Sequence, residues 1–170
     1  MTRRIFPTTV AYAFLFLSLV LLAAVFSATD ASASDTSPFA VLAGRWTGEG
    51  RLGLKDSPPE TVKCRATYFI TEGKDELKQN IRCATAGGSI EVKSEIQHAA
   101  GALTGKWQET TRNIAGDLTG SVTPNGFRVA VRGGDISANM DIIVRQNRQL
   151  IEIQFLNSSL VGLSLLMTKG

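Results

Sequence analysis

The chain has 170 residues, with 18 basic and 15 acidic side chains and a net charge of +3. The basic residues are scattered, whereas nucleic-acid binding requires a clustered basic face, so we expect no nucleic-acid partner. The sequence has two cysteines and one histidine and contains no metal-ligand motif or catalytic constellation. We therefore predict no metal, no cofactor and no enzymatic activity.

The N-terminal segment has the order of features that is typical of a secretory signal peptide. Arg3 and Arg4 form a basic start, residues 10–26 carry no charge, and Ala31-Ser32-Ala33 is a small-x-small cleavage site. We expect a bacterial Sec-type signal peptide over residues 1–33. The mature protein is then periplasmic or secreted, with no membrane span. Twin-arginine export is the less favoured route because the basic start is very short. An uncleaved anchor stays open because the apolar run is near the lower limit for crossing a bilayer.

After this segment, apolar and polar residues alternate in short runs that Gly, Asn and Pro interrupt. A period of two is typical of half-buried β-strands. The expected strands cover residues 45–54, 61–70, 77–85, 89–98, 102–110, 117–122, 127–132, 140–145, 151–155 and 161–168. Short connections join antiparallel neighbours, and a meander with one apolar face closes rather than leaving exposed edges. We predict an all-β fold, an antiparallel up-and-down β-barrel of about eight to ten strands over residues 45–170. Residues 34–44 form a tail or a short helical plug.

The cysteines set the register of one predicted hairpin. Cys64 and Cys83 lie at mirrored positions around a turn at residues 72–75, and a slip of one residue would put Cys64 opposite an outward-facing residue. A loop of this length places them in a closely spaced strand pair, which suits a disulfide. We predict a Cys64–Cys83 disulfide; the alternative is two free buried cysteines. The other pairs in this register are Ala66 with Ile81, Tyr68 with Gln79, and Ile70 with Leu77.

Residues 39–50 (FAVLAGRWTGEG) carry a family resemblance. A short apolar lead-in followed by Gly-x-Trp resembles the calycin superfamily, and is closest to its lipocalin-like and nitrobindin-like barrels. The resemblance implies a lipocalin-like barrel with Trp46 across its closed end and a ligand cavity at the other end. Nitrobindin-like barrels hold haem through a late histidine, but here the only histidine is His98, in mid-chain, so haem binding is not implied. Some periplasmic lipocalin-like barrels inhibit metalloproteases through an N-terminal tail, to which residues 34–38 would correspond.

Several inward-facing residues are candidates for a ligand cavity or its rim. They are Trp46, Tyr68, His98, Trp107, Met140 and Phe155. We expect Trp46 to be core, and we leave Trp107 open between core and cavity wall because tryptophan offers apolar area and an N–H donor. A metal site normally needs three or four donors, so we interpret His98 as a rim residue.

Two further groups of residues leave alternatives open. Four inward glycines leave room either for a cavity or for close backbone packing; they are Gly48, Gly50, Gly105 and Gly120. Glu109 and Asp117 flank a predicted turn at residues 110–116, and we expect solvated turn residues rather than an acid–base pair. Residues 107–113 are the predicted rim of the open end.

The sequence favours an exported lipocalin-like barrel that binds a small apolar or amphipathic ligand, such as a lipid. The alternative is a structural or interaction protein of the cell envelope, such as a periplasmic protease inhibitor. That alternative predicts a packed barrel and an exposed apolar patch that meets a protein partner. An enzyme would require perturbed ionisable groups clustered in a pocket around His98 or Glu109.

Overall fold

The computed structural model of the protein describes residues 36–71 and 75–170. Within this part of the chain, a 3-10 helix, η1 (Pro38–Leu42), precedes ten strands. The strands are β1 (Gly44–Leu54), β2 (Ser57–Ile70), β3 (Glu76–Thr85), β4 (Gly88–Ala99), β5 (Ala102–Glu109), β6 (Ile114–Thr123), β7 (Gly126–Gly133), β8 (Ile136–Arg145), β9 (Arg148–Phe155) and β10 (Leu160–Lys169). The predicted signal peptide and the first residues of the predicted tail lie outside the described residues.

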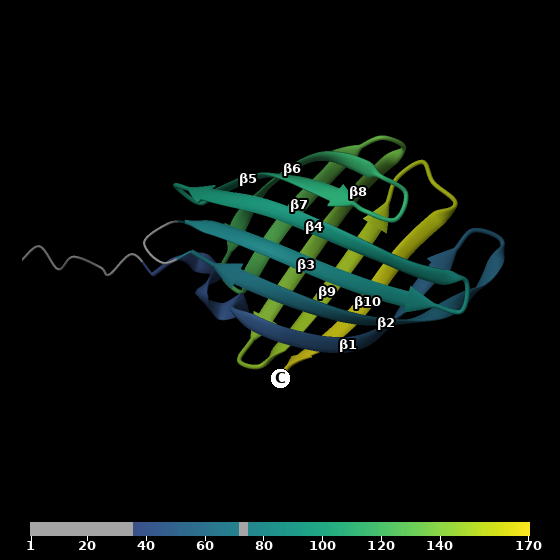
Figure 1. Ribbon diagram of the computed structural model, residues 1–170, viewed down its shortest axis with the longest axis horizontal. Coiled ribbons are helices and arrows are strands. Elements are labelled where there is room, and N and C mark those ends of the chain that lie inside the picture. Colours follow the sequence, from purple (N-terminus) through teal and green to yellow (C-terminus); the bar gives the residue numbers. More distant parts are fainter. Residues whose placement is uncertain (1–35, 72–74) are drawn as a thin grey trace, which may run out of the picture. The chain divides into compact units, whose positions relative to one another are not determined.

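The strands form one closed barrel. Each strand pairs with its sequence neighbour, and β1 pairs with β10 as well as β2 to complete the closure. All of these pairings are antiparallel. In Figure 1, strands β1 to β5 lie in front, and β7 to β10 cross behind them. Closure pairs the strand edges that an open meander would expose to other chains. The predicted all-β, up-and-down barrel is confirmed.

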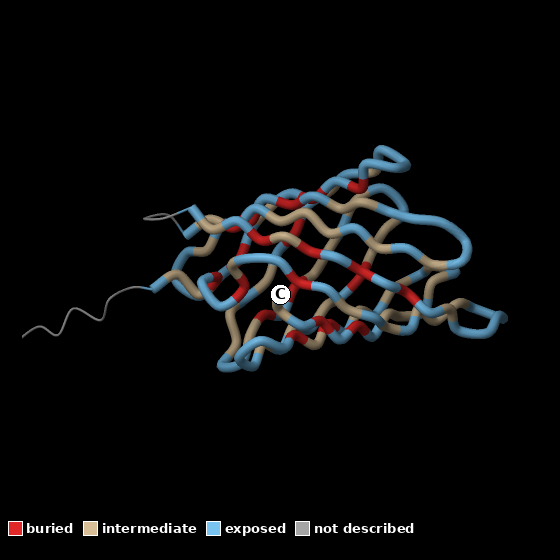
Figure 2. Tube along the Cα trace, turned by 60° about the horizontal axis from the view of Figure 1, so that its bottom comes forward, coloured by how far each residue is buried: buried red, intermediate tan, exposed pale blue. Residues whose placement is uncertain are grey.

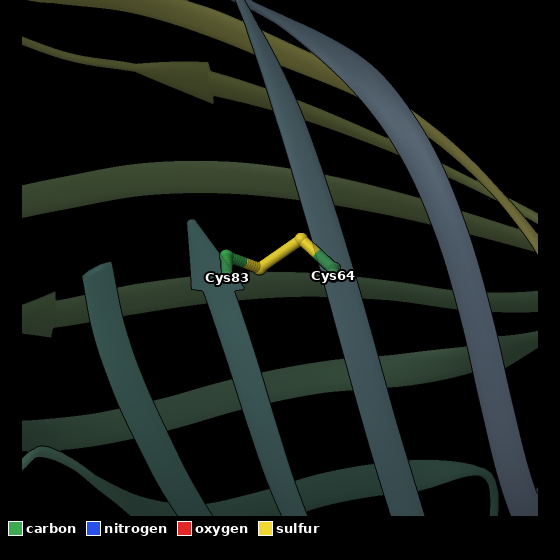
Figure 3. Close-up of a disulfide and its surroundings, with 2 residues drawn as sticks. All are labelled: Cys64 and Cys83. Carbon is green, nitrogen blue, oxygen red and sulfur yellow. A yellow bond between two sulfur atoms is a disulfide. The ribbon is translucent and has the colours of Figure 1, made fainter. Parts of the chain in front are cut away.

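The predicted disulfide and its register are also confirmed. Cys64 on β2 faces Cys83 on β3, and their sulfur atoms are bonded across the two strands (Figure 3). The three further pairs expected from this register occur as well. The Thr71 N–H donates to the Glu76 carbonyl at 3.3 Å, which leaves residues 72–75 between them, the loop length from which the register was predicted.

Four strands, β2, β6, β8 and β9, begin three or four residues earlier than the sequence pattern indicates. β2 begins at Ser57 and includes Pro58 and Pro59, which are tolerated because β3 pairs with β2 only from Lys63 onward. β6 begins at Ile114 rather than at residue 117, because Asn113 has a φ of 57° and ends the turn. The predicted turn at 110–116 is therefore too long.

The inward glycines serve close backbone packing. A Cβ atom at any of the four would overlap the carbonyl oxygen of a residue on a neighbouring strand. The oxygens belong to Leu166 for Gly48, Ser164 for Gly50, Glu95 for Gly105 and Arg128 for Gly120. Only glycine permits this approach, so the structure settles the alternative that the sequence leaves open.

Burial follows the strands rather than their connections. Figure 2 shows buried segments along the barrel wall and exposed segments at the hairpin tips. The buried core includes Trp46, Tyr68, Leu103, Phe127 and Met167. In the part of the chain that the structure describes, no helix is long and apolar enough to cross a membrane.

Candidate functional site

The two ends of the barrel differ in what covers them. One end, which we name the plugged end, carries η1, the end of β2, the start of β3, and the connections from β4 to β5, β6 to β7 and β8 to β9. The opposite end, which we name the far end, carries the remaining hairpin connections. In Figure 1 the plugged end lies to the left and the far end to the right.

At the plugged end, aromatic side chains join η1 to the barrel. Trp46 is fully buried, and its Nε1 donates a hydrogen bond of 2.7 Å to the Leu42 carbonyl at the end of η1. Phe39, also in η1, stacks on Phe127 with 5.7 Å between the ring centroids. Trp46 therefore connects η1 to the barrel interior, and the inward-facing Ile70, Val122, Ile142 and Val144 toward this end remain half-buried.

Toward the far end, the inward-facing apolar side chains remain partly exposed to solvent. Those that are half-buried include Leu52, Leu54, Val92, Ile114, Val131, Ile136, Ile153, Phe155 and Leu163. Ile90, also on the inward face, is 41% exposed. A close-packed interior would cover these side chains on every side. The inward face toward the far end is therefore partly open to solvent and mostly apolar, apart from Glu109; we name these ten apolar residues the open-end lining.

The six candidates from the sequence do not gather at one place. Trp46, Tyr68 and His98 lie toward the plugged end, whereas Phe155 belongs to the open-end lining. Met140 is half-buried near the middle of β8, where it pairs with Val129 and Ile153. Trp107, in β5, is 7% exposed, and its Nε1 donates to the Arg132 carbonyl at 3.3 Å. Of the six candidates, only Met140 and Phe155 combine an inward position with partial exposure and an apolar side chain.

His98 is held by two hydrogen bonds at the plugged end. Its Nε2 accepts from the Gly101 N–H at 3.0 Å, and its Nδ1 lies 3.3 Å from Asp75 Oδ2. This pattern corresponds to the neutral imidazole with the proton on Nδ1. Because both ring nitrogens have partners, the ring has no free nitrogen for a metal. Among residues 36–71 and 75–170, no group of three or more His, Cys, Asp or Glu side chains is arranged to hold a metal ion.

A buried polar pair lies inside the barrel near the plugged end. The Tyr68 hydroxyl donates to Gln149 Oε1 at 3.3 Å, and the Tyr68 ring meets Trp46 edge-on. Burial raises the pKa of Tyr68 to about 12, although the hydrogen bond to Gln149 acts in the opposite direction. Tyr68 is therefore a neutral donor. Gln149 is fully buried, and its Nε2 has no hydrogen-bond partner in the described part of the chain.

Sequence reasoning missed Gln149. The expected strand started at residue 151, but β9 starts at Arg148, and Gln149 shares the inward parity of Ile151 and Ile153. Extending the alternation by two residues toward the N-terminus would have found it. The turn before β9 falls one residue earlier than expected because Gln146, with a φ of 52°, takes the left-handed position.

The expectation that Glu109 is a solvated turn residue is wrong. Its side chain is 4% exposed and faces inward at the far end. One carboxylate oxygen accepts from the Thr111 N–H at 2.7 Å, and the other accepts from the N–H and the Nε of Arg112. Burial acts to raise the pKa of Glu109, but hydrogen bonds from Thr111 and Arg112 outweigh it and lower the pKa to about 2. Asp117 instead faces outward, where it pairs with Lys106 at 2.6 Å, so the two carboxylates do not form an acid–base pair.

Glu109 is expected to make stability fall in acid. Since its folded pKa lies below the ordinary value of 4.5, its contribution is complete above about pH 4.5 and is lost as the pH falls toward 2. Glu109→Gln should lower the free energy of unfolding at pH 7 by about 2 kcal/mol, the scale of hydrogen bonds to a charged group. Urea unfolding of both proteins from pH 7 to pH 2 measures this difference. The difference should shrink below pH 4.5, and a difference independent of pH would contradict this role.

A groove on the outside of the barrel is not a better candidate. It encloses about 800 Å³ across the outward side chains of β2 to β6, including Phe69, Lys78 and Lys106. Its three lysines are already paired: Lys78 lies 3.3 Å from Glu95, Lys93 lies 3.9 Å from Glu91, and Lys106 is bonded to Asp117. The groove therefore has no unbalanced cluster of charge, and we place the candidate site in the interior.

The fold and this interior define a lipocalin-like closed β-barrel. Among solved structures, Rv2717c from M. tuberculosis matches with a TM-score of 0.65 and 12% identity, over 79% of this chain and 98% of that chain. The S-type phycobiliprotein lyase CPES from Guillardia theta matches with a TM-score of 0.56 and 9% identity, over 78% of this chain and 90% of that one. At these identities the likeness concerns the fold alone, a closed antiparallel β-barrel. No protein-family model and no curated protein sequence matches the chain.

Proposed function

We propose that this protein is an exported barrel that binds a small apolar or amphipathic molecule in its interior, with entry from the far end. The observation that carries this proposal is the partial exposure of the open-end lining. A ligand that covers these walls gains roughly 25 cal/mol for each Å² of apolar surface removed from water. Ligand sites of this kind are concave, mostly apolar and largely preformed.

Two features support the exported part of the proposal. The chain has a Cys64–Cys83 disulfide. Disulfides persist in oxidising compartments outside the cytoplasm and are rare in the cytosol. The sequence of residues 1–33 has the order of features of a signal peptide. We infer a binding protein rather than an enzyme because His98 and Glu109, the residues around which a catalytic site would form, are both engaged in local hydrogen bonds.

Filling the interior is expected to weaken binding of a neutral apolar probe. Ile153 faces inward on β9, so Ile153→Trp should weaken binding of N-phenyl-1-naphthylamine by about tenfold or more, because the indole occupies the space the probe would take. Titration of probe fluorescence measures this change. The matched control is Gln154→Trp, which places the same side chain at the next, outward and exposed position and should leave the affinity unchanged.

The pair of variants makes the proposal falsifiable. Equal weakening by both tryptophans, or no binding to the unmodified protein, would contradict an interior site. If Ile153→Trp fails to fold, Val131→Phe fills the same end of the barrel with a smaller increase in volume.

One surface feature favours a second role, as an interaction protein of the cell envelope. Ile143, Leu150 and Leu166 face each other on the outside of β8, β9 and β10, and Ile143 and Leu166 are 40% and 43% exposed. Such a row of apolar side chains is a candidate contact for a protein partner. A photo-crosslinking residue at Leu166 should then capture one partner in the cell, and one at Ser164 should not. Equal capture from both positions would argue against this surface.

A further inference from the structure

The barrel interior contains a group of polar side chains beneath its apolar walls. Tyr68, Gln79 and Ser94 are cross-strand neighbours on β2, β3 and β4, and all three share the inward parity. Gln79 Nε2 donates to Ser94 Oγ at 3.1 Å. From the other side of the barrel, Gln149 on β9 reaches Tyr68. We name these four residues the interior polar group.

The interior polar group has an unused hydrogen-bond donor. Gln149 has no exposed surface, and its Nε2 has no partner among the described residues, while its Oε1 accepts from Tyr68. Buried donors are nearly always paired in folded proteins, because an unpaired one has lost its hydrogen bonds to water. The free amide hydrogens are therefore complementary to an acceptor atom that arrives with a ligand.

The surroundings of this donor favour an acceptor without charge. Among the residues that the structure describes, no cationic side chain bonds to Tyr68 or Gln149, and the pKa of Tyr68 responds to burial and to Gln149 rather than to a neighbouring charge. Lys169 lies over the Trp46 ring, 5.7 Å from its centroid, where the aromatic face is its partner. An ionised carboxylate placed beside Gln149 would be buried without a counter-charge, which is strongly unfavourable.

We propose that the interior polar group receives an uncharged carbonyl group of an amphipathic ligand, whose apolar part extends toward the far end. This inference rests on the proposed function and adds the chemical class of the ligand: a ketone, ester or amide with an apolar chain. The carbonyl oxygen accepts from Gln149 Nε2, and the chain contacts the open-end lining.

Met167 on β10 pairs with Gln149 and is also fully buried. Methionine is unbranched and has several rotatable bonds, so its side chain adapts to a new neighbour more readily than a β-branched residue does. We expect the Met167 side chain to rearrange as the carbonyl group enters, without a change in the strand register.

The test compares ligands with chains of matched length. Decan-2-one, decane and decanoate each compete with N-phenyl-1-naphthylamine for the purified full-length protein, with affinities corrected for partition from water into hydrocarbon. The inference predicts that decan-2-one binds at least about tenfold more tightly than decane, and more tightly than decanoate. Gln149→Leu should remove the advantage of the ketone over decane. The matched control is Gln154→Leu, which makes the same substitution at an outward, exposed position of β9 and should retain it.

The outcomes separate this inference from the proposed function. If the probe binds but ketone and decane are equivalent, the buried amide holds at most a water molecule and the inference is wrong, while the proposed function stands. If decanoate binds most tightly of the three, the inference that the ligand presents an uncharged carbonyl group is wrong. Failure of the probe to bind at all would overturn both. If Gln149→Leu does not fold, Gln149→Met removes the same donor with an unbranched side chain, and persistence of the ketone preference in either variant overturns the inference.

Discussion

Replacing Trp46 with alanine is expected to lower the free energy of unfolding by about 3 to 5 kcal/mol, the usual cost of truncating a buried tryptophan. Trp46 has no exposed surface, meets Tyr68 edge-on, and bonds to the Leu42 carbonyl. The variant therefore loses core packing and also the hydrogen bond that joins η1 to the barrel. Urea unfolding followed by circular dichroism measures the change.

Two control variants separate these contributions. Trp46→Phe keeps an aromatic ring but removes the donor to Leu42, so it should have an intermediate effect. Phe69→Ala removes an aromatic ring from β2 that is 60% exposed, and it should change stability by less than about 0.5 kcal/mol. Equal effects of Trp46→Ala and Phe69→Ala would contradict the packing of the plugged end.

Removing the disulfide is expected to lower the free energy of unfolding by about 3 kcal/mol. Cys64 and Cys83 are separated by 19 residues, and a crosslink that closes a loop of this size restricts the unfolded chain by roughly that amount. The change is Cys64→Ala together with Cys83→Ala, measured by urea unfolding at pH 7. Because both side chains face the interior, alanine keeps the inward positions apolar.

Reduction of the unmodified protein provides the control for this prediction. A reducing agent should lower the unfolding midpoint of the unmodified protein and leave that of the double alanine variant unchanged. Detection of two reactive thiols in the denatured, unreduced protein would contradict the crosslink.

The barrel and the β2–β3 register can both be predicted from the sequence. The strands follow from the local alternation of apolar and polar residues, and the register follows from one long-range constraint, the pairing of Cys64 with Cys83. Once Cys64 faces Cys83, parity assigns every other residue of the hairpin to one face of the sheet. Turn residues then fix where each strand must end, and the antiparallel order follows from short connections. These signals are periodic, so they survive small errors in the strand boundaries.

The burial and hydrogen bonding of individual polar residues follow no periodic pattern in the sequence, so they are predicted less well. Glu109 is buried because the backbone N–H groups of Thr111 and Arg112 turn toward it, and that geometry exists only after the hairpin forms. The inward glycines are required by the approach of neighbouring strands, which one strand's sequence does not reveal. Gln149 lies beyond the predicted start of its strand, so its inward position and its contact with Tyr68 emerge only from the fold.

The central claim is that the open-end lining binds a small apolar molecule, and the position of a bound probe tests it most directly. Methyl NMR spectra of the isoleucine residues, recorded during titration with N-phenyl-1-naphthylamine, report this position. The account predicts shifts at the inward-facing Ile90, Ile114 and Ile153, and no shift at the outward-facing Ile143, although Ile90 and Ile143 are equally exposed, at 41% and 40%. Shifts at Ile143 without shifts at the inward isoleucines would place the probe outside the barrel and contradict the account.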